Sequence, residues 1–128
     1  MAWRESFNVP PMVHANPIPS ASRVGNMLYT SVISGRDPAT GNVPESVDEQ
    51  AVNAFKNLSN ILAKAGATAG DVAHVTVFVR DISVRPHVNT PWVEMFPDEN
   101  SRPARHTIVD AALAGMLQIE AVAVIQER

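Results

Sequence analysis

The chain has 128 residues, no cysteine and a formal net charge of -3 at pH 7, which fits a single domain, residues 1–128, around one core. The lack of cysteine excludes a disulfide framework and any thiolate site, and the ten basic residues are scattered, which argues against a stripe for nucleic acid. No window approaches the ~20 apolar residues of a membrane span, so we expect a soluble cytoplasmic protein.

The first third of the chain predicts two strands and two loops. Residues 5–9 form a first short strand, and the four prolines between residues 10 and 19 predict an irregular stretch, because each removes a donor from a sheet ladder. Residues 24–34 are rich in β-branched and aromatic types and predict one strand, which the Gly25-Asn26 turn introduces. Residues 35–44 then read as a loop.

The clearest helix is predicted over residues 47–65. Its apolar positions recur every three or four residues, which is typical of a helix with one packed face. Ser46, followed by Glu49 three residues later, is a capping-box signature, and Gly66 supplies a left-handed stop.

The second half predicts a strand over residues 71–81, apolar on one face and mixed on the other, and a short helix over residues 86–96. Trp92 in this helix is expected in the core. Two closing strands, residues 104–113 and 117–125, are predicted to form a hairpin through residues 114–116.

This hairpin holds two candidate site residues, Arg105 and Glu120, and can place the guanidinium near the carboxylate. The planar guanidinium of arginine can bind a carboxylate through two hydrogen bonds, so Arg105 could bind a small organic acid. Glu120 could move a proton or orient a water molecule. The alternative is that the two residues form a structural ion pair or face solvent.

The element order predicts an α+β fold, β-β-α-β-α-β-β, with two helices on one face of the sheet. The other face would have no partner inside the chain. Its mixed side chains, such as Thr76, Phe78 and Arg80, are too apolar to be plainly solvated. We therefore expect subunits to pack sheet against sheet with closed symmetry, and sites to lie between subunits.

The chain resembles the RidA (YjgF-like) reactive intermediate deaminase family over nearly its whole length. The resemblance rests on the order and spacing of short motifs: Gly25-Asn26-Met27, Thr30-Ser31, residues 37–44, Glu49-Gln50, Asn57-Leu58, Ala65-Gly66-Ala67, residues 76–81, Val88-Asn89, Phe96, Pro103-Ala104-Arg105 and Ile119-Glu120-Ala121.

The resemblance implies a chorismate-mutase-like fold, a homotrimer with a central barrel, and three clefts at the subunit interfaces. It implies hydrolysis of 2-imino or 2-enamino acids to 2-oxo acids and ammonia, without a metal or organic cofactor. Arg105 would bind the substrate carboxylate, Glu120 would position the attacking water, and Ser31 and Asn89 would line the cleft. Thr107 stands where the family often has a cysteine that makes a backbone contact.

Several alternatives stay open at this stage. A shifted frame would place Gln118 rather than Glu120 at the water-orienting position, and a neutral amide cannot act as a base. A usual aromatic residue is absent near Ile18 or Ser20, and Val32 replaces a usual glycine, which leaves the substrate open. The second functional reading is a non-catalytic trimer that binds small carboxylates on the same fold. The net charge argues against a third, RNA cleavage.

Overall fold

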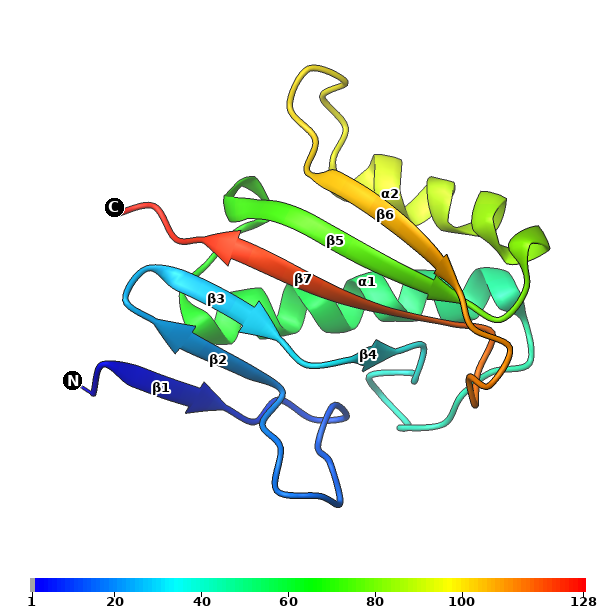
Figure 1. The fold of residues 1–128 in the computed structure, drawn as a ribbon, viewed down its shortest axis with the longest axis horizontal. Coiled ribbons are helices and arrows are strands. Elements are labelled where there is room, and N and C mark those ends of the chain that lie inside the picture. Colours follow the sequence, from blue (N-terminus) through cyan, green and yellow to red (C-terminus); the bar gives the residue numbers. More distant parts are fainter. Residues whose placement is uncertain (1) are drawn as a thin grey trace.

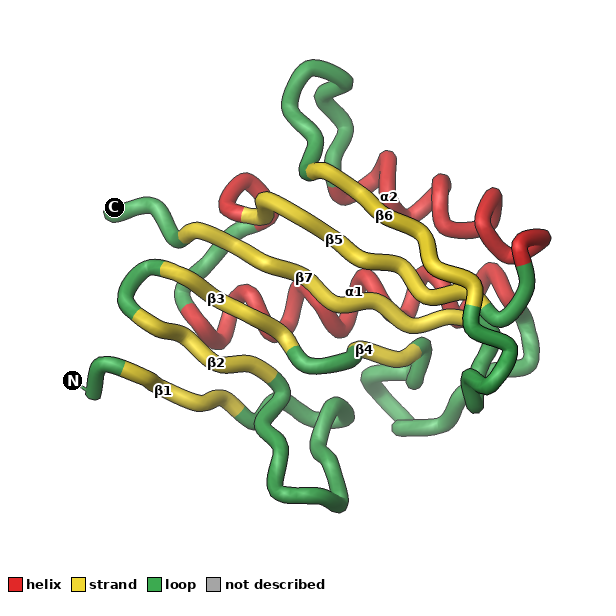
Figure 2. The backbone as a smooth tube through the Cα atoms, viewed as in Figure 1, coloured by secondary structure: helices red, strands yellow, loops and turns green. Residues whose placement is uncertain are grey.

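The structure is a computed structural model that describes residues 2–128. Its strands are β1 (Arg4–Phe7), β2 (Ala21–Val24), β3 (Met27–Thr30), β4 (Ile33–Ser34), β5 (Val72–Val79), β6 (Ala104–Val109) and β7 (Leu117–Val124). Its helices are α1 (Val47–Ala65), α2 (Asn89–Met95) and the 3-10 helices η1 (Ala69–Asp71) and η2 (Ile82–Val88) (Figure 2). Within residues 2–128, no helix is long and apolar enough to cross a membrane.

All seven strands belong to one mixed sheet, in the order β1-β2-β3-β7-β5-β6, with β4 also paired to β7. Only the β5–β6 pair is parallel. Figure 1 shows α1 and α2 together behind the strands, so both helices cover one face of the sheet. This arrangement confirms the predicted α+β class with two helices on one face.

The predicted strand over residues 24–34 is divided into parts. Gly25 adopts a left-handed φ of 59° at the turn between β2 and β3, a conformation that glycine reaches without steric cost. The chain then leaves the ladder for two residues before β4 resumes pairing with β7. β2 begins at Ala21, directly after the proline-rich loop, and this strand start was missed.

The predicted hairpin of the last two strands is wrong. β5 lies between β6 and β7, pairing with β6 in parallel and with β7 in antiparallel fashion. Both strands were predicted, but their pairing depends on contacts with β5, which precedes both η2 and α2 in the chain. A sequence pattern reports burial of a strand and not the identity of its neighbours, so proximity in sequence misled the prediction.

Helix α1 begins and ends where its caps predicted. The Ser46 hydroxyl accepts a hydrogen bond from the Glu49 amide at 3.2 Å, and Gly66 has φ 80° in the left-handed region. The Gly66 amide donates to the last turn of the helix. These local interactions satisfy backbone groups that a helix leaves free at its ends, which is why the bounds could be read from the sequence.

The second predicted helix starts earlier and in a different form. Asp81 accepts a hydrogen bond from the Ser83 amide at 2.9 Å and begins η2, which passes through Pro86 before α2 starts at Asn89. Proline lacks an amide hydrogen and crowds the preceding turn, which favours a short 3-10 segment over a longer α-helix. Trp92 is buried, as predicted, and packs edge-on against Phe96.

The two faces of the sheet differ in burial. The core lies between the sheet and α1, where residues such as Val75, Val77, Ile119, Leu58 and Ile61 have no exposed surface. The opposite face, called here the open face, has no cover from the described residues. Side chains from β3, β5, β6 and β7 that alternate with the core residues point there: Met27, Tyr29, His74, Thr76, Phe78, His106, Ile108, Gln118, Glu120, Val122 and Val124.

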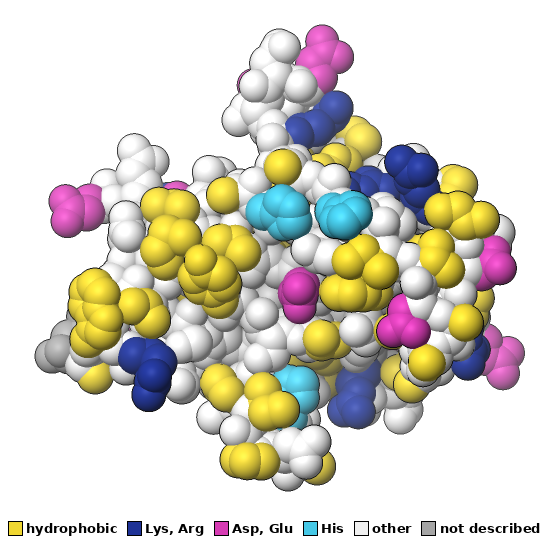
Figure 3. Space-filling model, viewed as in Figure 1, with side chains coloured by type: hydrophobic (Ala, Val, Ile, Leu, Met, Phe, Trp, Pro, Cys, Tyr) yellow, Lys and Arg dark blue, Asp and Glu magenta, His cyan; other side chains and the backbone are white. Residues whose placement is uncertain are grey.

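The open face carries substantial apolar surface. Figure 3 looks onto it and shows hydrophobic side chains gathered on the left and again on the right, with two histidines and an acidic side chain between them. Tyr29 is 52% exposed and Val124 is 41% exposed. Of the two neighbours Val77 and Phe78, the structure buries Val77 in the core and leaves Phe78 partly exposed, so Phe78 is the one available to a neighbouring molecule.

Candidate functional site

Arg105 is held in place by two residues of α2. Its Nη1 donates to Asn89 Oδ1 at 3.0 Å, and its guanidinium carbon lies 5.1 Å from the centroid of the Trp92 ring. A guanidinium over an indole face is stabilised by the ring quadrupole, and the contact fixes the plane of the fork. The structure thus brings together two of the predicted site residues, Arg105 and Asn89, and adds Trp92 beneath them.

The electrostatic surroundings of Arg105 are unfavourable to its own charge. Partial burial lowers the pKa of Arg105 below its ordinary value, and the positive charge of Arg85 lowers it further. Arginine nevertheless stays protonated in proteins. Both effects therefore raise the energy of the unliganded cation, and an incoming anion would relieve them.

A pocket of about 840 Å³ surrounds this guanidinium. We call it the arginine pocket; its lining includes Arg85, Asn89, Trp92, Arg102, Arg105 and Thr107, and none of its lining residues is acidic. Thr107, the third predicted residue on this side, shares the sheet face of Arg105 because the two are separated by one residue of β6. Such a pocket suits an organic anion.

Glu120 lies on the other face of the sheet. Arg105 is opposite Val75 of β5, and Val75 is opposite Ala121 of β7, so these three side chains share the helix-covered face. Glu120 is opposite Thr76 and therefore points to the open face. Within one chain, β5 and the thickness of the sheet separate the Arg105 guanidinium from the Glu120 carboxylate. The expected meeting of the two groups inside a hairpin is a second error of that prediction.

Gln118 shares the open face with Glu120, because the two alternate with buried Ile119 along β7. Gln118 is opposite Phe78 of β5 and Ser34 of β4. Both candidates for the water-orienting position are thus partly exposed on the same surface. The fold alone does not choose between the two residues.

Ser31 lies in the gap between β3 and β4, next to the part of β7 that carries Glu120. The register passes from Tyr29 opposite Val122 to Ile33 opposite Ile119, which places the gap beside Glu120. The Ser31 hydroxyl donates to the Pro19 carbonyl at 2.7 Å, which ties the gap to the proline-rich loop.

Two asparagines of α1 hold the segment that follows this gap. Asn57 Nδ2 donates to the Ser34 carbonyl at 3.2 Å and to the Arg36 carbonyl at 2.8 Å. Asn53 Nδ2 donates to the Gly35 carbonyl at 3.2 Å. These amides fix the backbone of residues 34–36 against α1. Only Asn57 belonged to a motif noted in the sequence, and no pattern there indicated this role.

Sequence reasoning also missed two members of the arginine pocket. Trp92 was expected in the core alone, and it does pack there, but its ring face also supports Arg105. Arg85 is a single basic residue in an irregular segment and carries no motif. Its place beside Arg105 follows from η2 and β6 both lining the arginine pocket, which no local pattern reports.

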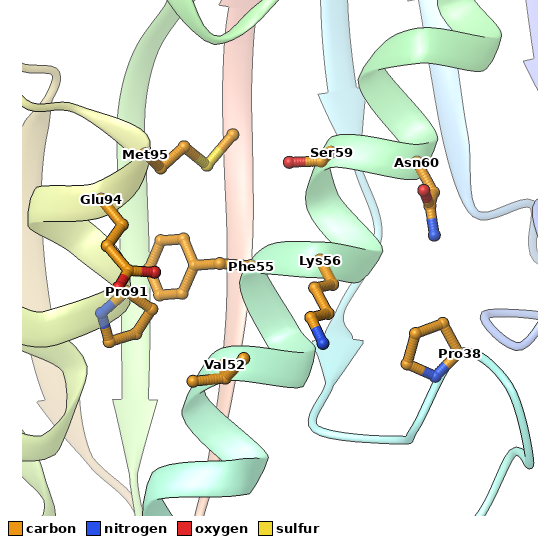
Figure 4. Close-up of a pocket in the computed structure, with 9 residues that line it drawn as sticks. All are labelled: Pro38, Val52, Phe55, Lys56, Ser59, Asn60, Pro91, Glu94 and Met95. Carbon is orange, nitrogen blue, oxygen red and sulfur yellow. The ribbon is translucent and has the colours of Figure 1, made fainter.

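A separate pocket of about 450 Å³ lies between α1 and α2. Figure 4 shows Phe55 and Lys56 extending from α1 and Glu94 and Met95 from α2. Its lining contains one cation and one carboxylate on separate helices, together with apolar side chains. None of the predicted site residues lies there.

Comparison with known proteins identifies the family. The family model described as Endoribonuclease L-PSP matches residues 12–126. A RutC family protein of Haemophilus influenzae is 38% identical over 112 residues, covering 84% of this chain and 86% of that protein. The 2-iminobutanoate/2-iminopropanoate deaminase of Escherichia coli is 36% identical over 104 residues, covering 79% and 81%.

Solved structures agree with this result. The crystal structure of E. coli TdcF with bound serine matches with a TM-score of 0.81 and 27% identity, over 94% of each chain. The same fold, the matched length and the identity to curated relatives lead to one conclusion. The chain belongs to the Endoribonuclease L-PSP family, which is also called the YjgF/RidA family.

Proposed function

We propose that this protein hydrolyses 2-imino or 2-enamino acids to 2-oxo acids and ammonia. Arg105 binds the substrate carboxylate, and Glu120 positions the attacking water. Asn89 and Thr107 line the cleft near Arg105, where the substrate carboxylate binds. Ser31 lines it near Glu120, where the water molecule binds. The 36% identity to an E. coli protein named for this deaminase activity supports the proposal.

The observation that carries the proposal is the state of Arg105. Its guanidinium is preorganised by Asn89 at 3.0 Å and by the Trp92 ring, yet none of residues 2–128 offers it a carboxylate within ion-pair distance. A partly desolvated cation without a counter-ion is costly. A residue held this way is suited to receive the carboxylate of a ligand.

The proposed chemistry needs few groups. An imine carbon next to a carboxylate is already electrophilic, so positioning supplies much of the catalysis. Glu120 accepts a proton from water as the oxygen attacks the imine carbon, and the nitrogen takes up a proton. The proton held by Glu120 then passes to the amino group of the resulting carbinolamine, its hydroxyl loses a proton to solvent, and the C–N bond breaks, which releases ammonia and leaves the 2-oxo acid. No electrons are exchanged with another reactant.

The positions of Arg105 and Glu120 support a site formed between chains. Because the two groups point to opposite faces of one sheet, Arg105 of one chain can act with Glu120 only of another. The open face, with exposed Tyr29, Ile108 and Val124, offers apolar surface for such packing. We propose a homotrimer with closed symmetry, three interface sites and no cofactor.

Ammonia release from imino acids tests the reaction. An amino-acid oxidase generates imines of varied side chain in the assay, and the protein is added in catalytic amounts. We expect ammonia to form faster than in the uncatalysed control with at least one of these imines. Equal rates with and without the protein for every side chain would contradict the proposal.

One observation favours a second candidate, a trimer that binds small carboxylates without catalysis. Gln118 shares the open face with Glu120 and lies beside Ser34, and an amide in the water-orienting position could hold a ligand but not remove a proton. Measurable affinity for a small carboxylate, together with no hydrolysis of any imine, would identify this function.

A further inference from the structure

We propose that the arginine pocket selects ligands with two anionic groups, and that Arg85 is the receptor for the second one. In the reaction proposed above, the preferred substrates are then dicarboxylic imino acids, whose 2-imino carboxylate binds Arg105 and whose side-chain carboxylate binds Arg85. Only the catalytic part of this inference rests on the proposed function. The selectivity of binding can be measured without turnover.

Three arginine side chains share one pocket. Arg85, Arg102 and Arg105 all line it, on η2, on the loop before β6 and on β6 itself. A single carboxylate on Arg105 would neutralise one of these three charges. The pocket therefore has more positive charge than a monocarboxylate needs, and no lining acid balances it.

Arg85 is the cation that is free to bind. Its guanidinium makes no hydrogen bond or ion pair to any residue that the structure describes. Arg102 differs, because its Nε donates to the Phe96 carbonyl at 2.8 Å and its Nη2 to the Pro97 carbonyl at 3.4 Å. Arg102 thus adds charge to the pocket, whereas Arg85 keeps its whole fork available for a carboxylate.

Two acidic residues near η2, Asp81 and Asp48, are already engaged. Asp81 begins η2 and accepts a hydrogen bond from the Ser83 amide at 2.9 Å. Asp48 Oδ1 lies 2.7 Å from His87 Nδ1. Neither residue lines the arginine pocket. Within the described residues of one chain, no acidic side chain that lines the pocket supplies a counter-charge for Arg85.

The proximity of Arg85 also affects Arg105. Its positive charge is one of the two causes that lower the pKa of Arg105, so the two guanidiniums repel each other when the pocket holds no anion. A ligand with a carboxylate on each guanidinium removes this repulsion as well as forming two ion pairs. A ligand with an apolar side chain would place that side chain next to the Arg85 guanidinium and leave the guanidinium without a counter-ion.

Calorimetric titration of the full-length protein tests the selectivity with two probes of equal chain length, succinate and butyrate, at constant ionic strength. We expect succinate to bind about tenfold more tightly than butyrate, as one additional charge-assisted contact would give. In Arg85→Met this preference should disappear, through loss of succinate affinity with little change for butyrate. Lys64→Met is the matched control, because it removes one exposed positive charge from α1, outside the pocket, and should keep the preference.

Two results would overturn the inference. One is equal affinity of the wild type for succinate and butyrate. The other is an equal loss of affinity for succinate and for butyrate in Arg85→Met. This result would show that Arg85 supports the carboxylate that both ligands share and does not bind a second one. Far-ultraviolet circular dichroism and thermal melting of Arg85→Met and Arg85→Lys confirm that the variants fold, and Arg85→Lys should retain part of the preference.

Turnover separates this inference from the proposed function. We expect kcat/KM to be higher for the imine generated from aspartate than for the imine generated from alanine, and Arg85→Met should remove this preference. If the wild type prefers succinate but hydrolyses neither imine, the deaminase proposal fails and the dianion site stands. If both imines are hydrolysed equally well and succinate has no advantage, the dianion site fails and the deaminase proposal stands.

Discussion

Arg105 and Glu120 point to opposite faces of the same β-sheet, with β5 between their strands. Arg105 lies over Trp92 on the side of the helices, and Glu120 lies on the face that has no cover within the described chain. A reaction that uses both residues therefore needs a second copy of the chain.

Arg105→Ala should abolish imine hydrolysis and leave the fold intact. The substitution removes both the charge and the planar fork that the Asn89 contact and the Trp92 ring orient. Arg105→Lys should restore only part of the activity, because an ammonium group cannot bind a carboxylate in the same bidentate way. The measurement is kcat/KM for ammonia release, with melting temperature as the control. Activity of the alanine variant at the wild-type level would reject the site.

Glu120→Gln should lower kcat by about 100-fold while the affinity for a carboxylate ligand changes little, since the amide keeps the shape but loses the base. Gln118→Ala is the matched comparison on the same strand and face. Steady-state kinetics and ligand titration separate the two effects. A silent Glu120→Gln together with a damaging Gln118→Ala would assign the water-orienting position to Gln118 instead.

Phe78→Glu should dissociate the trimer. Phe78 is on the open face, and an uncompensated charge buried at an interface costs several kcal/mol. Val93→Glu is the control, because Val93 is 46% exposed on α2, away from the strands. Sedimentation or light scattering gives the mass, which should be that of a trimer for the wild type and the control. A fully active monomer would contradict both the assembly and the interface site.

Asp71→Asn should destabilise the protein at neutral pH by about 1 to 3 kcal/mol. Burial tends to raise the pKa of Asp71, but the Arg128 side chain and the Thr68 and Gln126 amides outweigh this effect and hold the pKa below its ordinary value. A lowered folded-state pKa gives stability that is present above the unfolded pKa and is lost as pH falls through the folded value.

Denaturant unfolding of the wild type and Asp71→Asn across pH checks this sign. The difference in free energy of unfolding should be constant near neutrality and shrink below about pH 4. Asp98→Asn, at an exposed turn where Asp98 accepts from the Asn100 amide, should change stability little at any pH. A difference between the wild type and Asp71→Asn that persists unchanged at acid pH would contradict the assignment.

Features of the fold with local causes could be predicted from the sequence. Helix α1 was correct from Val47 to Ala65 because Ser46 and Gly66 end it by hydrogen bonds within a few residues. The alternation along residues 72–79 likewise reports one buried face directly. The parallel pairing of β6 with β5 could not be predicted this way, since it depends on which strand occupies the centre of the sheet.

In the candidate site too, features with local causes could be predicted and features that depend on long-range contacts could not. Arg105 could be proposed because its residue type and motif suggest a carboxylate receptor, and the structure places Asn89 in contact with it. The position of Glu120 on the other face was missed because the hairpin was wrong. Arg85 was missed because its proximity to Arg105 arises from a long-range contact, between η2 and the strand that follows α2.

Complementation between two inactive chains tests the central claim most directly. Arg105→Ala and Glu120→Gln chains are expressed together, so that mixed trimers form, and ammonia release is compared with each variant alone. If each site takes Arg105 from one chain and Glu120 from its neighbour, about a quarter of the sites in randomly mixed trimers regain both groups, and activity should return to that extent. Mixed trimers with no more activity than the separate variants would contradict a site shared between chains.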